Sequence, residues 1–143
     1  MTFFKLQTPR DMLEKANREY ARLCDSFDID NVFNYFVTAY HISDYIKKTK
    51  AVEQSTLSKF LEDPDIKMSR DLCDKGKHMT LTHRPDPKTK IITGGWGTGP
   101  WGLAPWGGGE SWSLVTNDQN INIKQLSKIV LEKWTSFFQN NGL

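Results

Sequence analysis

The sequence predicts a mainly α-helical single domain over residues 1–143. We expect a bundle of four main helices, with a β-hairpin carrying a Gly/Trp-rich loop inserted before the last helix. Apolar residues recur every three or four positions over about 9–26, 29–49, 64–79 and 123–139, which is the spacing of amphipathic helices. Residues at both ends of about 88–117 instead alternate between apolar and polar, as strands do. The stretch between, Gly94–Trp112, holds eight of the chain's ten glycines and four of its five tryptophans.

The first helix has a clear start in the sequence. Thr8 can cap it, Pro9 suits the first helical position, and Asp11 completes a capping-box pattern. The apolar stripe that follows consists of Leu13, Ala16, Tyr20, Leu23 and Phe27. One buried face is therefore expected for this helix.

The second helix carries apolar residues on two sides, which predicts a central place in the bundle. One face is centred on Phe33 and also contains Ile29, Phe36, Val37 and Tyr40. The other patch consists of Ala39, Ile42 and Ile46. Asp44 falls roughly 20° from Phe33, so we expect its carboxylate to point inward. Because a buried charge without a partner is costly, a neighbouring helix should supply a cation.

The third main helix is predicted to start at Asp63-Pro64, after a polar connection over 51–62 that contains one short helix. Its apolar side consists of Met68, Leu72, Cys73, Gly76 and Met79. Arg70, Asp74 and Lys77 line the border of that side, and His78 lies further round. Charged groups of this helix are thus placed where they can face the second helix.

A change of pattern separates the third helix from the last one. The segment Arg84-Pro85-Asp86-Pro87 excludes a helix, and the hairpin is predicted to follow it with its loop at 94–110. The last helix then carries an apolar stripe and stops at Asn140-Asn141-Gly142. The stripe consists of Ile123, Leu126, Val130, Trp134 and Phe137.

The composition of the chain favours a cytoplasmic protein without a transmembrane helix. No apolar run reaches the roughly 18 residues of a transmembrane helix, so no membrane partner is expected. The N-terminus lacks the plan of a signal peptide. Cys24 and Cys73 lack CxxC spacing, so we expect buried free thiols and a cytoplasmic location. The net charge of +2 is uneven, because residues 67–90 hold seven Lys or Arg against three Asp.

A polar pocket between the second and third helices is the main candidate site. The second helix offers His41, Asp44 and Lys48 on one border, and the third offers Arg70 and Lys77 as partners for Asp44. Such a cluster can satisfy a buried carboxylate as a structural salt bridge, bind a phosphate, or move protons. A metal-independent RNase uses a histidine as acid or base, together with a cation that stabilises the charge on the phosphoryl group.

Arg70-Asp71 followed by His78, late on a helix of an α-helical bundle, resembles the Arg-polar-gap-His motif of HEPN domains. Toxin and defence members of that family are metal-independent RNases that act as dimers. The resemblance implies a catalytic group of Arg70, Asp71 and His78, and a homodimer. If the borders of the second and third helices face each other, His41 can also approach His78. Seven residues separate Arg70 from His78 here, more than in the family. The combination of Ala39-Tyr40-His41 and Asp44 with Arg70-Asp71-Leu72 and Lys77-His78 also resembles small uncharacterised bacterial and phage proteins, which implies a shared fold and no activity.

The Gly/Trp-rich loop supports a second hypothesis, a non-catalytic binding protein of a mobile element or phage. Exposed indole rings are costly unless something covers them. They can stack on the bases of RNA or a nucleotide while basic side chains reach phosphates, or form a surface that captures a host protein. They can also fold back as a plug on the bundle. The ligand-binding residues expected are Trp96, Trp101, Trp106, Trp112, Arg84, Lys88 and Lys90.

Other chemistries are disfavoured by the sequence. His41, Asp44, His78 and His83 contain metal-binding residue types, but nearby lysine and arginine would repel a cation, so neither a metal nor another cofactor is expected. The chain lacks the Gly-x-Ser-x-Gly motif of a serine nucleophile and the Gly-rich signatures of phosphate-binding loops.

Overall fold

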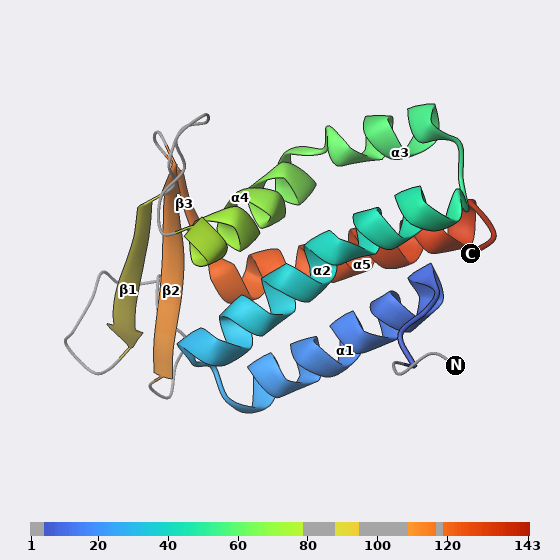
Figure 1. Cartoon of the computed structure of the whole chain (residues 1–143). Coiled ribbons are helices and arrows are strands. Elements are labelled where there is room, and N and C mark those ends of the chain that lie inside the picture. Colours follow the sequence, from blue (N-terminus) through green and yellow to red (C-terminus); the bar gives the residue numbers. More distant parts are fainter. Residues whose placement is uncertain (1–4, 79–87, 95–108, 117–118) are drawn as a thin grey trace.

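A computed structural model of the chain describes residues 5–78, 88–94, 109–116 and 119–143, with side chains described for 5–75 and 122–143. The fold is mainly helical, as predicted. Four long helices lie alongside one another, and three strands stand at one end of the bundle (Figure 1). The helices are α1 (Pro9–Asp25), α2 (Ile29–Thr49), α3 (Gln54–Leu61), α4 (Pro64–His78) and α5 (Ile123–Asn140).

Local sequence signals set where the first two of the long helices begin. The Thr8 hydroxyl accepts from the Asp11 N–H at 3.1 Å, and the Asp11 carboxylate accepts from the Thr8 N–H at 2.9 Å, so the predicted capping box forms. Asp28 caps α2 through the Asn31 N–H at 2.9 Å. Each cap gives an otherwise unpaired backbone N–H of the first turn an acceptor.

Helix α2 contacts α1, α4 and α5, which confirms its predicted central place. The predicted patch of Ala39, Ile42 and Ile46 is buried, whereas the face centred on Phe33 is fully buried only at Phe36, so the prediction that this face is buried is wrong. Phe33 is 39% exposed and Ile29 is 61% exposed. The buried side of α2 is formed by Val32, Tyr35, Phe36, Thr38, Ala39, Ile42, Ser43 and Ile46. Apolar residues lie on both sides of this helix, so periodicity alone leaves its rotation open, and packing against three neighbours decides it.

The core sits between α1, α2 and α5. Trp134, Tyr35 and Phe138 are among its largest fully buried side chains. The Tyr35 hydroxyl donates to the Ser127 carbonyl at 2.6 Å, which satisfies the polar end of a ring that is otherwise enclosed. Cys73 is buried and in no disulfide, as predicted, whereas Cys24 is exposed, because its position on α1 lies outside the buried stripe.

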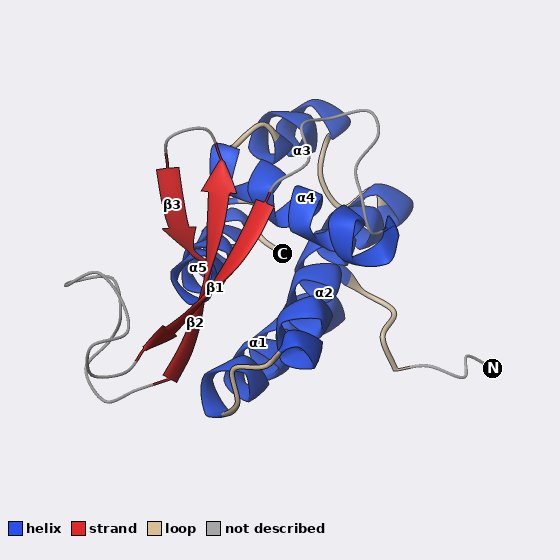
Figure 2. Cartoon of the chain, turned by 90° about the vertical axis from the view of Figure 1, so that its left-hand side faces the viewer, coloured by secondary structure: helices blue, strands red, loops and turns tan. Residues whose placement is uncertain are grey.

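Three strands precede α5 at one end of the bundle (Figure 2). They are β1 (Lys88–Gly94), β2 (Gly109–Thr116) and β3 (Gln119–Asn122), antiparallel in the order β1-β2-β3, with β3 not foreseen from the sequence. The register sets Gly94 opposite Gly109. Most of the predicted Gly/Trp-rich loop, residues 95–108, lies outside the described residues. The hairpin as a carrier of that loop therefore stays a prediction.

Within the part of the chain that the structure describes, no helix has the length and apolar character needed to cross a bilayer.

Candidate functional site between α2 and α4

Tyr40 marks the place where charged groups of α2 and α4 come together. Its side chain is half-buried on α2. Burial raises the pKa of the Tyr40 hydroxyl, and the carboxylates of Asp74 and Asp44 raise it further, while Arg70 acts in the opposite direction. The phenol therefore stays protonated at neutral pH. Groups from both helices lie close enough to Tyr40 to act on its charge, so the predicted border between α2 and α4 is a polar one.

Arg70 lies on the α4 side of this border. Its guanidinium donates to the Asp71 carboxylate through Nε at 3.4 Å and Nη2 at 3.3 Å. The two side chains are 29% and 24% exposed. A guanidinium that is held by long hydrogen bonds and partly open to solvent can exchange its carboxylate partner for another anion.

His41 lies on the α2 side, with its Nε2 atom 3.9 Å from Oδ2 of Asp44. The side chains of His41 and Asp44 are 34% and 40% exposed. The carboxylate of Asp44 is thus partly open to water rather than fully inward, because the buried face of α2 is the opposite one. Its predicted pairing with Arg70 or Lys77 stays a prediction, and Lys48 lies exposed near the end of α2.

Among the residues with described side chains, the buried carboxylate is that of Glu19, on α1. It is 7% exposed, and its Oε1 atom accepts from Lys15 at 3.2 Å and from Arg22 at 2.9 Å. Lys15 also donates to the Thr38 hydroxyl of α2 at 2.9 Å. The buried carboxylate that pairs with cations is therefore Glu19 and not Asp44, and both cations, Lys15 and Arg22, come from the same helix.

The remaining predicted site residues have only a backbone position or none. Lys77 and His78 close α4, Lys88 and Lys90 are on β1, and Trp112 is on β2 opposite Ile91. Arg84, Trp96, Trp101 and Trp106 lie outside the described residues.

Sequence reasoning missed Tyr40 as a polar member of the site, because it was assigned to an apolar face. A signal was present, since Tyr40 precedes His41 directly and stands one turn before Asp44. The ring centroids of Tyr40 and His41 are 6.5 Å apart.

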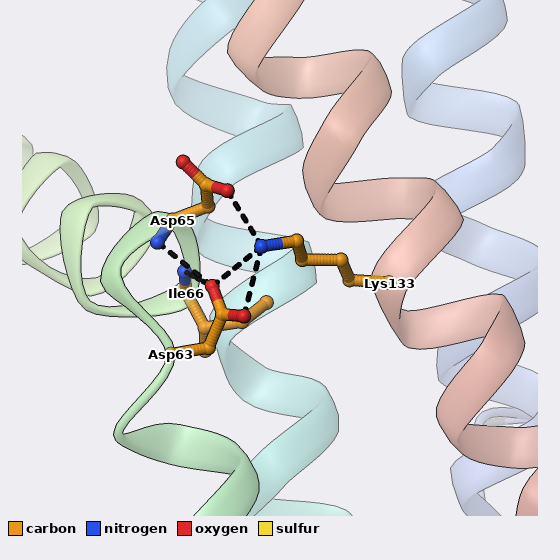
Figure 3. A network of polar contacts seen from close by, with 4 residues as sticks. All are labelled: Asp63, Asp65, Ile66 and Lys133. Carbon is orange, nitrogen blue, oxygen red and sulfur yellow. Dashed lines mark hydrogen bonds and ion pairs between the residues drawn. The ribbon is translucent and has the colours of Figure 1, made fainter.

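A second polar cluster, also missed, ties α5 to the start of α4 (Figure 3). Lys133 of α5 donates to both carboxylate oxygens of Asp63 at 2.8 Å and to Oδ2 of Asp65 at 2.6 Å. Burial alone would raise the pKa of the Asp63 carboxyl, but Lys133 and the N–H groups of Asp65 and Ile66 hold it below its usual value. The cluster therefore stabilises the fold at neutral pH and weakens as the pH falls through the pKa of Asp63.

Among the residues with described side chains, no group of three or more His, Cys, Asp or Glu is arranged to hold a metal ion.

No protein-family model, no curated protein and no solved structure matches the chain.

Proposed function

We propose that this chain is a HEPN-like protein that acts on RNA or a nucleotide, as a metal-independent RNase of the toxin or defence type. The observation that supports it is the polar border between α2 and α4, where Tyr40 of α2 lies within the electrostatic reach of Arg70 and Asp74 of α4. The proposal places the protein in the cytoplasm, as its cysteine pattern suggests, and makes it a homodimer, as its resemblance to the family implies.

Each role follows from the chemistry of the side chain. Arg70 would stabilise the negative charge that develops on the phosphoryl group, and Asp71 would orient its guanidinium. His41 and His78 would move the protons, with Asp44 beside His41. No step requires a metal ion.

Charge balance sets a condition on this proposal. Asp44, Asp71 and Asp74 outnumber Arg70, and this excess of carboxylates repels a phosphate. The cations that follow on α4, Lys75 and Lys77, must then contribute to binding. Phosphate contacts make binding dependent on salt, so we expect RNA affinity to fall as the salt concentration rises.

The alternative function is capture of a nucleotide or host protein by the Gly/Trp-rich loop, without catalysis. Its support is the pairing of β1 with β2, whose register brings the two ends of the loop, Gly94 and Gly109, opposite each other. Stacking on aromatic rings is worth about 1–3 kcal/mol per base in proteins that bind single strands. In this case His41, Arg70 and His78 would be dispensable.

One pair of variants separates the two functions. His78→Ala should lower RNA cleavage in EDTA by about 100-fold or more, because it removes a proton-transfer group, and should leave RNA binding intact. Trp101→Ala combined with Trp106→Ala should weaken RNA binding and leave RNA cleavage intact. Cleavage rates measured on a labelled RNA, together with binding by fluorescence anisotropy, provide both readouts. Undiminished cleavage by His78→Ala would remove His78 from the catalytic group.

A further inference from the structure

An open groove of about 330 Å³ runs along α5 beside the Lys133 cluster. Helix α5 contributes residues spaced one turn apart, α3 contributes Phe60, and the junction between α3 and α4 contributes Asp63. The α5 residues that define its length are Ile129, Glu132, Phe137 and Asn140. The groove therefore spans three turns of α5 and is separate from the border between α2 and α4.

The ammonium group of Lys133 is fully engaged. It has three N–H donors, and its three acceptors are the two oxygens of Asp63 and Oδ2 of Asp65. Burial alone would lower the pKa of Lys133, but the two carboxylates raise it above its usual value, so it stays charged. An incoming anion would find these donors taken. Two carboxylates, Asp63 and Glu132, line the groove against one lysine, and Asp65 pairs with that lysine from outside the lining, so the surplus charge is negative and favours a cation.

The apolar side of the groove suits the stem of a long basic side chain. The Phe60 ring is half-buried and lies 4.4 Å from the Phe137 ring and 4.6 Å from the Trp134 ring, centroid to centroid, so it is held in place by the core. Guanidinium groups stack on aromatic rings and pair with carboxylates, and their aliphatic stems cover apolar surface.

We propose that this groove binds an arginine side chain from an exposed segment of a partner protein. The guanidinium lies against Phe60 with Glu132 as its carboxylate partner, and the flanking residues of the segment follow α5 towards Asn140. The proposal depends on the complementary charge of the groove and does not depend on the proposed RNase activity.

Three short peptides test this proposal on the full chain. The probes are acetyl-Leu-Arg-Leu-amide, the same peptide with citrulline in place of arginine, and acetyl-Leu-Glu-Leu-amide. Amide chemical shifts are followed by NMR during titration. The arginine peptide should shift resonances over 129–140 and bind at least about fivefold more tightly than the citrulline peptide, which has the same shape but no charge. The glutamate peptide should leave these resonances unchanged.

Two surface variants locate the contact. Glu132→Gln should weaken binding of the arginine peptide about fivefold and leave binding of the citrulline peptide unchanged. Glu14→Gln, at an exposed position of α1, should change neither. The proposal is overturned if the arginine peptide does not shift the α5 resonances, if arginine and citrulline bind equally, or if the glutamate peptide or an RNA oligonucleotide shifts the same resonances.

Discussion

Arg70→Ala is expected to lower RNA cleavage by about 100-fold to 1,000-fold, the usual effect of removing one group that stabilises transition-state charge. The loss should appear mainly in kcat, because the guanidinium is needed most when charge develops on the phosphoryl group. The side chain is 29% exposed and pairs with Asp71, which is 24% exposed, so its removal should cost about 1 kcal/mol or less of folding stability. Cleavage rates and urea denaturation of the same samples separate the two effects.

The contribution of the paired hydrogen bonds of the Arg70 guanidinium can be tested separately from that of its charge. Arg70→Lys keeps the charge but loses paired hydrogen bonding, so its rate should lie between those of the wild type and Arg70→Ala. Arg18→Ala, at an exposed position of α1, serves as the control for removal of an arginine. Equal rates for the wild type and Arg70→Ala would exclude Arg70 from the catalytic group.

Ile42→Ala is expected to lower the free energy of unfolding by about 2–5 kcal/mol, because it leaves a cavity in the core. Ile42 is fully buried on the side of α2 that packs against the other helices. Ile29→Ala offers a matched control, since it makes the same change in the same helix at a position that is 61% exposed. Its effect should be about 0.5 kcal/mol or less.

Urea denaturation followed by far-UV circular dichroism measures both values. The comparison tests the rotation of α2 directly, because the two residues lie on opposite sides of the helix. A larger loss from Ile29→Ala than from Ile42→Ala would restore the face centred on Phe33 as the buried one.

Local signals made the helices predictable. Thr8 and Asp11 act within one turn of each other, and so do Asp28 and Asn31, so a few neighbouring residues encode each of these helix starts. The predicted ranges of the four long helices differ from the observed ones by at most one residue at either end. The local sequence of each helix was therefore sufficient to predict its range.

The rotation of α2 could not be predicted in the same way. Its apolar residues do not form a single stripe, so Phe33 was as good a centre for the buried face as Ile42. Only the packing of α1, α4 and α5 around the helix determines which of the two faces is buried. Because the rotation of α2 was predicted wrongly, Asp44 was expected to be buried and Tyr40 was assigned to an apolar face.

Contacts between distant residues account for the rest of what the sequence did not reveal. The Lys133 ammonium donates to Asp63 across 70 positions of the chain, and the packing of α2 on α4 brings Tyr40 within electrostatic reach of Arg70. Residue types suggested that charges of α2 and α4 face each other, but they could not indicate which carboxylate pairs with which cation.

The most direct test of the account is to map where RNA binds. A 2′-O-methyl RNA oligonucleotide, which resists cleavage because its 2′-hydroxyl groups are blocked, is titrated into the isotopically labelled protein while amide chemical shifts are followed. If RNA binds at the border between α2 and α4, resonances over 40–44 of α2 and over 70–75 of α4 should shift, and these shifts should weaken as the salt concentration rises. Shifts confined to β1 and β2, or no shifts at all, would contradict binding at this border.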